Sequence, residues 1–402
     1  MKIAAFETFV VGNPPPHKGG RYFIFVKLVT DDGLVGYGEV YTATFSPAVV
    51  ATMTEDVCER HVVGMDPHHI ERMWRRIYSS GYTARPDISL VSILSGIETA
   101  CWDIIGKAAN KPVYELLGGQ VHERIRTYTY LYPADASVDI SAGIDVYSEP
   151  DIAATRAADY LAQGFTGLKL DPMGGYSAFD PRQPSLERLD LAEAMVAAIR
   201  DAVGSSADIL FGTHGQFTAA GAIRLAARLE KYDPLWLEEP TPAEMPEEMA
   251  KVARATTIPV ATGERLTTKY EFRRVLEQGA ASILQLALGR VGGLLEAKKI
   301  AGIAEAHYAQ LAPHLYCGPI EAAANIALSV CSPNFLILES IENWNGFHSE
   351  ILVEPIQWED GYVIPSTAPG IGVALNEEVA RANPYEGHQL HLEMDDDPLD
   401  SV

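Results

Sequence analysis

Several short apolar runs in this sequence are followed at once by side chains that bind cations or move protons. These side chains are Lys169 and Asp171, His214, Glu238, Glu264 and Arg265, His314, and Glu339. Carboxylate oxygens are the ligands that Mg²⁺ selects, and neighbouring carboxylates repel each other unless a cation lies between them. Lysine and histidine beside such a cation can transfer protons near neutral pH. The combination indicates metal-assisted acid–base chemistry.

Each of these residues, taken alone, also has an ordinary structural explanation. Lys169 could be a salt-bridge partner, and the pair Glu238–Glu239 could be the solvated start of a loop. His314, which follows Ala-Pro, could be a structural histidine. A functional site becomes the better explanation if the runs before these residues are strands whose carboxyl ends meet at one face.

The pattern around these residues predicts a barrel. From about Arg124 to Ser340, short apolar runs alternate with amphipathic stretches of helical periodicity. The strand candidates are Thr127–Tyr132, Gly167–Leu170, Ile209–Phe211, Leu235–Leu237, Pro259–Ala261, Ser282–Gln285, Gln310–Ala312 and Phe335–Leu338. Eight strands with intervening helices are typical of an α/β fold of the (β/α)8 type, whose functional side chains lie at the carboxyl ends of the strands. A doubly wound open sheet is the alternative, but such sheets commonly stop at about six strands.

The first part of the chain predicts a separate α+β domain, residues 1–124. Its predicted strands and helical stretches are Ile3–Val11, Tyr22–Thr30, Gly36–Val40, Ser46–Ser79 and Leu90–Ala109. The turn Asp31-Asp32-Gly33 is a strong hairpin signal between the second and third strands. We assign the barrel to residues 125–355. Residues 356–402 contain a β-like stretch, Gln357–Val363, and an acidic tail, and we expect them to return to the first domain.

Composition excludes several classes of partner. Of 402 residues, 54 are acidic and 31 basic, so the net charge is −23 and the surface repels nucleic acid and anionic membranes. The four cysteines lie far apart without metal-ligand spacing, which is typical of free thiols in a reducing cytoplasm. The chain contains no run of eighteen apolar residues and no nucleotide-binding glycine motif. We therefore expect a cytoplasmic protein with a small-molecule partner, no membrane span and no nucleic acid.

Longer motifs carry a family resemblance. The run SGIETACWDIIGKAANKPVYELLGG, followed by GFTGLKLD, WLEEP, ATGERL, SILQ, GRVGG and APHLYCGPI, resembles the enolase superfamily in its mandelate racemase/muconate lactonizing enzyme-like branch. The resemblance extends over nearly the whole chain. Position 212, Glu238 and Glu264 follow each other at intervals of 26 residues, as three successive metal-ligand positions of that family do. Within the branch, GERLTTKYEFRRVLEQGAASILQ and LAPHLYCGPI are most similar to galactonate dehydratase-like sugar-acid dehydratases.

This resemblance implies a modified (β/α)7β barrel, one Mg²⁺ ion, and a capping domain formed by the N-terminal region and the C-terminal segment. It also implies roles for single residues. Glu238 and Glu264 would be metal ligands, His314 would be the base, and His214 would be the acid that protonates the leaving hydroxyl. Lys169 would contact the substrate carboxylate or assist proton transfer, and Glu339 would form a hydrogen bond to the substrate carboxylate. We assign Asp171 and Arg265 to the substrate site as well. Members of the family commonly form homo-oligomers, and specificity is expected in capping-domain loops such as Gly12–Gly20, where Lys18 adds positive charge.

The sequence departs from the family pattern at three of these positions. Gly212 stands where the first metal ligand, an aspartate, is expected, so the metal would keep two glutamates and water, recruit His214, or bind poorly. Asp171 replaces the second lysine of the β-strand motif, which serves as the base in racemases of one hand. Ala287 replaces the aspartate that partners the histidine base. Racemisation needs a base on both faces of the substrate, whereas dehydration needs one base and one acid.

The sequence therefore predicts a metal-dependent lyase. It would remove the α-proton of a sugar acid, an aldonate or aldarate, and eliminate the β-hydroxyl to give a 2-keto-3-deoxy acid. An epimerase or cycloisomerase acting on a related acid is one alternative. A ligand-binding relative that has lost catalysis is the other, and Gly212 and Ala287 are the residues that favour it.

Overall fold

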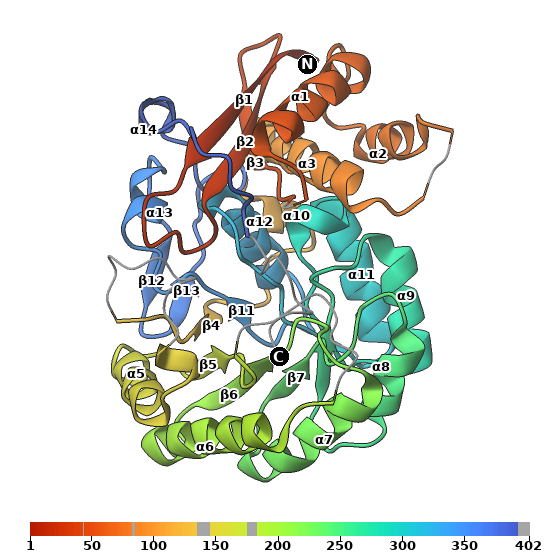
Figure 1. Cartoon of the computed structure of the whole chain (residues 1–402). Helices are drawn as coiled ribbons and strands as arrows, with labels where there is room; N and C mark the ends of the chain where they lie inside the picture. Colours follow the sequence, from red (N-terminus) through yellow and green to blue (C-terminus); the bar gives the residue numbers. More distant parts are fainter. Residues whose placement is uncertain (43, 83–84, 135–144, 175–182, 393–402) are drawn as a thin grey trace.

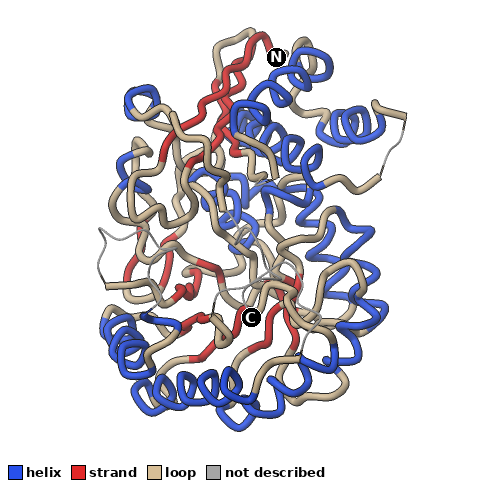
Figure 2. The backbone as a smooth tube through the Cα atoms, in the orientation of Figure 1, coloured by secondary structure: helices blue, strands red, loops and turns tan. Residues whose placement is uncertain are grey.

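The computed structural model describes residues 1–42, 44–82, 85–134, 145–174 and 183–392. Figure 1 shows the N-terminal strands and helices at one end of the molecule and a ring of strands and helices at the other. In Figure 2 the strands of this ring lie inside and most of its helices lie outside. The acidic tail expected from Glu393 lies outside the described residues.

The N-terminal part is a three-stranded antiparallel meander followed by helices. Its elements are β1 (Ile3–Gly12), β2 (Tyr22–Thr30), β3 (Val35–Glu39), α1 (Pro47–Val57), a π-helical turn (Cys58–Val62), α2 (Ile70–Ser79), α3 (Ile88–Ala109) and α4 (Val113–Leu116). Helix α3 packs on the meander so closely that a Cβ at Gly38 would lie 1.9 Å from the carbonyl oxygen of Gly96. Glycine in β3 is therefore required for this contact.

Helix α3 forms much of the core of the N-terminal part. It is long and apolar enough to cross a membrane, but 72% of its most apolar window is buried inside the molecule. It is the only such helix among the described residues. Asp87 caps its start by accepting from the backbone N–H groups of Ser89 and Leu90, and Asn110 ends it in the left-handed conformation. Its apolar surface is that of a buried core helix.

The second part contains the predicted barrel strands. Seven of them, in the described residues, pair in parallel in chain order: β4 (Ile125–Tyr130), β5 (Gly167–Leu170), β6 (Asp208–Gly212), β7 (Trp236–Glu238), β8 (Val260–Thr262), β9 (Ile283–Leu284) and β10 (Gln310–Leu311). Strand β11 (Leu338–Glu339) pairs in parallel with β4, and a single bridge joins Leu311 to Phe335 just before β11. The first and last strands of the alternation therefore lie side by side.

Helices connect these strands. They are α5 (Pro150–Ala162), α6 (Leu186–Val203), α7 (Ala219–Leu229), α8 (Pro246–Ala253), α9 (Thr268–Gln278), the short α10 (Leu288–Val291), α11 (Leu294–Ala306) and α12 (Pro319–Val330), with 3₁₀ turns at Asp145–Tyr147 and Glu230–Tyr232. Because the strands run parallel, all their carboxyl ends lie at the same end of the barrel.

The C-terminal segment divides between the two parts. After α13 (Phe347–Glu350) at the end of the barrel range, it contains β12 (Gln357–Glu359), β13 (Tyr362–Ile364) and α14 (Glu377–Ala382). The expectation that the whole segment returns to the N-terminal part is wrong for the β12–β13 hairpin, which pairs antiparallel with β4. Strand β4 begins before its pairing with β5 and β11, and β13 takes up that stretch. Farther on, Pro384 bridges to Val11 of β1.

Two buried glutamates fix the N-terminal part to the barrel helices. Glu39, the last residue of β3, accepts from the backbone N–H groups of Gly318 (2.5 Å) and Glu321 (3.0 Å) at the start of α12. Glu98 of α3 accepts from Leu294 (2.7 Å) and Leu295 (2.9 Å) at the start of α11. The first N–H groups of a helix have no partner within the helix, and its dipole favours an anion there. We call Glu39 and Glu98, with the helix starts they cap, the domain junction.

Candidate active site

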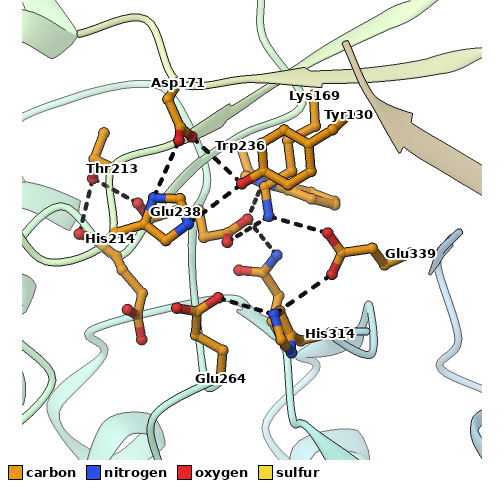
Figure 3. A network of polar contacts seen from close by, with 12 residues as sticks. Tyr130, Lys169, Asp171, Thr213, His214, Trp236, Glu238, Glu264, His314 and Glu339 are labelled. Carbon is orange, nitrogen blue, oxygen red and sulfur yellow. Dashed lines mark hydrogen bonds and ion pairs between the residues drawn. The ribbon is translucent and has the colours of Figure 1, made fainter. Parts of the chain in front are cut away.

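The predicted site residues come together at the carboxyl ends of the strands. Lys169 lies in β5 and Asp171 just beyond it, His214 follows β6, Glu238 ends β7, Glu264 follows β8, His314 follows β10, and Glu339 ends β11. Figure 3 shows these side chains pointing towards one another from different strands. All of them are buried or nearly so. We call this group, together with Glu239 and Arg265, the barrel mouth.

A chain of close contacts between acidic and basic side chains runs through the barrel mouth. The Lys169 Nζ atom lies 2.6 Å from Glu238 Oε1 and 3.6 Å from Glu339 Oε1. The other oxygen of Glu339 is 3.9 Å from His314 Nε2, which lies 3.3 Å from Glu264 Oε2. Acidic and basic side chains therefore alternate along this chain of contacts, although they come from strands far apart in the sequence (Figure 3).

Lys169 is a buried cation. Burial alone would lower its pKa, but the charges of Glu238 and Glu339 outweigh burial and raise the pKa of Lys169 above its usual value. Its Nζ atom also lies 4.7 Å from the centre of the Tyr130 ring. A lysine that keeps its proton is suited to holding an anionic group and stabilising its charge.

His314 is a neutral imidazole. Burial lowers its pKa to about 3, although the charge of Glu264 acts in the opposite direction. Its Nδ1 atom is buried without a hydrogen-bond partner among the described residues. The residue that bridges to it, beyond the end of β9, is Ala287, whose methyl group offers no acceptor. His314 can accept a proton at neutral pH, but it lacks the acceptor that would strengthen it as a base.

His214 lies beside a tyrosine and an aspartate. Its Nδ1 atom is 3.4 Å from Asp171 Oδ2, and its Nε2 atom is 3.5 Å from the Tyr130 hydroxyl. Its backbone has a left-handed φ of 49°, and Arg265 donates to its carbonyl oxygen. Burial lowers the pKa of His214 to about 4. The barrel mouth thus holds a second neutral imidazole, built on a different strand from His314.

Carboxyl groups outnumber the cations of the barrel mouth. Four of them, Glu238, Glu239, Glu264 and Glu339, face the permanent cations Lys169 and Arg265, and a fifth, Asp171, lies beside His214. Burial raises the pKa of Glu239 to about 8 and that of Glu339 to about 7. It also raises the pKa of Asp171 and Glu238, with help from neighbouring carboxylates. Because buried like charges are costly, the arrangement favours a further cation.

The donors of the barrel mouth fit a hard divalent metal in kind. Glu238 and Glu264 offer oxygens at the ends of neighbouring strands, and Asp171 and His214 lie beside them. Within the described part of the chain, no three acidic, histidine or cysteine side chains converge closely enough to hold an ion as they stand. Glu238 instead accepts from Lys169 (2.6 Å), Gln285 (2.6 Å) and the Trp236 indole (3.1 Å). Binding therefore requires a movement of these side chains.

Four further residues belong to this region, and none of them was assigned a role from the sequence. Tyr130 ends β4 and contacts both Asp171 and His214, and Gln285 follows β9 and donates to Glu238. Arg290 lies over the Tyr41 ring at 3.9 Å and donates to the Glu264 carbonyl oxygen. Tyr41, from the N-terminal part, stacks on His314 at 6.1 Å. The strand-end rule could have found Tyr130 and Gln285, whereas Tyr41 reaches the barrel only through tertiary packing.

The cationic loop Gly12–Gly20 also reaches the barrel. Its Lys18 forms an ion pair of 2.6 Å with Glu342, which follows β11, and lies over the Tyr132 ring. Arg156 of α5 contacts the same glutamate at 3.2 Å. Lys18 therefore ties the N-terminal loop to the rim of the barrel near the barrel mouth.

Comparison with known proteins gives two family matches and close relatives. The model described as "Enolase C-terminal domain-like" matches residues 153–379, and that described as "Mandelate racemase / muconate lactonizing enzyme, N-terminal domain" matches residues 17–118. The D-galactonate dehydratase of Ralstonia nicotianae is 36% identical over 386 residues, which cover 94% of this chain and 93% of that protein. The D-galactonate dehydratase of Klebsiella pneumoniae is 35% identical, with the same coverage.

Solved structures agree with these matches. A structure from Labrenzia alexandrii DFL-11, assigned to the mandelate racemase/muconate lactonizing enzymes, has a TM-score of 0.95 and 64% identity, and covers 98% of this chain and 100% of its own. The mandelate racemase/muconate lactonizing enzyme from Sulfitobacter has a TM-score of 0.94 and 52% identity, with 99% of each chain covered. At these identities and TM-scores the likeness extends over the whole fold.

Proposed function

The chain belongs to the enolase superfamily, in its mandelate racemase/muconate lactonizing enzyme branch, and from this premise we propose that it is a lyase that dehydrates a sugar acid. The substrate class is an aldonate or aldarate, and the product is a 2-keto-3-deoxy acid. The names of the curated relatives make D-galactonate the first substrate to test. The proposed cofactor is Mg²⁺, held by Glu238 and Glu264. The proposed barrel is the (β/α)7β form of the family, covered by the N-terminal capping domain.

The observation that carries the proposal is the pair of neutral imidazoles at the barrel mouth with a buried ammonium beside them. His314, which follows β10, can take the proton from the α-carbon. His214, which follows β6, can in its protonated form donate a proton to the departing β-hydroxyl. Asp171 stands where racemases need a second lysine, so a second base for proton return to the other face is lacking at that position.

The same residues account for the electrostatics of the reaction. When the α-proton leaves, the substrate carboxylate gains negative charge, and interactions that strengthen at this stage lower the barrier. The Lys169 ammonium lies in the middle of the barrel mouth and can stabilise that charge. Bound Mg²⁺ would supply the larger share of this positive charge. Once the hydroxyl has left as water, the resulting enol takes a proton at the β-carbon and becomes the keto acid.

The proposal also covers the location and the assembly of the protein. A small carboxylate substrate and assembly into a homo-oligomer follow from the family resemblance, and a cytoplasmic site of action follows from the four widely separated cysteines. The acidic surface and the buried apolar α3 are compatible with them.

The experiment is a substrate screen. Purified protein with Mg²⁺ is incubated with a library of aldonic and aldaric acids, and mass spectrometry detects the loss of one water. We expect at least one acid to give a keto product that reacts with semicarbazide, and His314→Asn to abolish it. Deuterium uptake at the α-carbon without water loss would identify an epimerase or cycloisomerase instead. The absence of both reactions throughout the library would contradict the proposal.

A further inference from the structure

Position 212, which lacks a side chain, faces a carboxylate from another strand. A Cβ atom built on Gly212 would lie 2.3 Å from Asp171 Oδ1. In an aspartate, two standard bonds place each carboxylate oxygen about 2.4 Å from its own Cβ atom. The Asp171 oxygen therefore lies at the distance from position 212 at which the oxygen of an aspartate there would lie. We propose that Asp171, from the end of β5, supplies the metal ligand that Gly212 at the end of β6 does not.

The contacts of Asp171 support this role. Its carboxylate is 3.4 Å from the Tyr130 hydroxyl and 3.4 Å from His214 Nδ1, and both contacts are long for hydrogen bonds to a charged group. Its side chain is only 15% exposed. By contrast, Glu238 accepts two bonds of 2.6 Å. A shielded carboxylate with long contacts, next to a glutamate that matches a ligand position, is the group at the barrel mouth that most lacks a close cation.

Side chains at positions 171 and 212 would compete for the same space. A Cβ at Gly212 would also lie 2.9 Å from the Tyr130 hydroxyl and 3.3 Å from the Lys169 Cε atom. An aspartate at 212 and one at 171 therefore cannot both fit as the chain stands. The glycine at 212 and the aspartate at 171 are best understood as one exchange, in which the carboxylate has moved to the neighbouring strand. This replaces our sequence-based assignment of Asp171 to substrate binding.

The inference rests on the proposed metal-dependent function but concerns binding, so it can be tested without substrate. Mn²⁺ serves as the probe, and electron paramagnetic resonance measures free and bound ion for the full chain. Four variants are compared with the wild type: D171N, G212D, the double variant D171G/G212D, and D190N. Asp190 is a control because it lies on α6, pairs with Arg228 on the surface and is 67% exposed.

We expect D171N to weaken Mn²⁺ binding by at least about tenfold, since even changes to residues behind the ligands commonly cost that much. D190N should bind as the wild type does. G212D should also bind worse, because its carboxylate collides with Asp171. D171G/G212D should restore binding to within a few-fold of the wild type, because one carboxylate again occupies the shared space. Circular dichroism of each variant shows whether it is folded.

Two results would overturn the inference. One is Mn²⁺ binding by folded D171N at wild-type affinity; a concurrent change in the NMR titration of His214 would then show that Asp171 only positions this histidine. The other is a wild-type protein that binds no Mn²⁺. The proposed function fails separately: if D171N loses Mn²⁺ while the wild type dehydrates no acid, the ligand assignment stands and the dehydratase does not.

Discussion

Two regions of this molecule bury acidic side chains, and they do so in opposite ways. At the domain junction, Glu39 and Glu98 each accept two backbone N–H groups at the start of a barrel helix. At the barrel mouth, Glu238 and Glu339 face a lysine, and Glu264 faces a histidine. The junction carboxylates are satisfied by fixed dipoles, whereas the mouth carboxylates are opposed by groups that can move or exchange protons.

The difference shows that burial and a raised pKa do not by themselves identify a functional carboxylate. Burial raises the pKa of Glu39 to about 8 and that of Glu339 to about 7, yet only Glu339 faces an imidazole and an ammonium. The partner of the acid separates a structural from a catalytic role. The following variants test this separation, from the largest expected effect to the smallest.

Removing the base at the barrel mouth should abolish chemistry and spare the fold. We expect His314→Asn to lower kcat by about 10²- to 10⁴-fold, the usual contribution of a general base. The free energy of unfolding should change little, because His314 Nδ1 already lacks a partner among the described residues. Steady-state kinetics and urea unfolding measure the two effects. A His314→Asn protein with more than a tenth of the wild-type kcat would remove His314 from the mechanism.

Removing the ammonium of the barrel mouth should damage the fold. Lys169→Met leaves Glu238 and Glu339 buried without their counter-charge, so unfolding should become easier by about 3–5 kcal/mol in the absence of metal. The double variant Lys169→Met/Glu238→Gln should recover part of this loss, because the remaining charge is smaller. Urea titrations of both variants provide the test. A loss below about 1 kcal/mol for the single variant would mean that the ion pair is not what neutralises these acids.

Removing a carboxylate from the domain junction should give the opposite pattern to His314→Asn. Glu98→Ala leaves the N–H groups of Leu294 and Leu295 without their acceptor, and we expect a loss of about 2–4 kcal/mol of stability. The kcat of the folded protein should stay within a few-fold of the wild type, since Glu98 caps α11 and is not part of the barrel mouth. If kcat falls as far as in His314→Asn, the distinction between the two regions fails.

The smallest expected effect is a pH dependence of the stability, caused by Glu39 at the domain junction. Because the folded-state pKa of Glu39 is raised to about 8 by burial and by Glu321, the folded protein holds this proton more tightly than the unfolded chain does. The stabilisation is complete below the unfolded pKa near 4.5 and is lost as pH rises through about 8. Glu39→Gln should flatten this part of the stability curve. An unchanged slope in the variant would assign it to other groups.

Much of this arrangement could be predicted from the sequence, because it depends on local patterns. Strand β5 was predicted with its observed bounds, Gly167–Leu170, since its apolar run ends sharply at both sides. The convergence of Lys169, Glu238 and His314 followed from the rule that parallel strands end at one face. These inferences needed only the periodicity of the chain and the order of its elements.

Other features depend on which distant segments meet, and sequence patterns do not encode this. The β12–β13 hairpin joins β4 because that strand begins before its other partners, which no local signal reveals. The stacking of Tyr41 on His314 depends on how the capping domain sits on the barrel. The Asp171 carboxylate occupies the space that a side chain at Gly212 would need, and this depends on the exact spacing of two neighbouring strands.

The central claim is that His314 takes the α-proton and His214 completes the loss of water. Its most direct test is proton NMR in D₂O with Mg²⁺ and a sugar acid that the wild-type protein dehydrates. The spectra follow the α-hydrogen of the substrate and the formation of the keto acid product. We predict that His214→Asn exchanges the α-hydrogen for deuterium but forms little product, and that His314→Asn does neither. Exchange by His314→Asn at the wild-type rate would contradict the account.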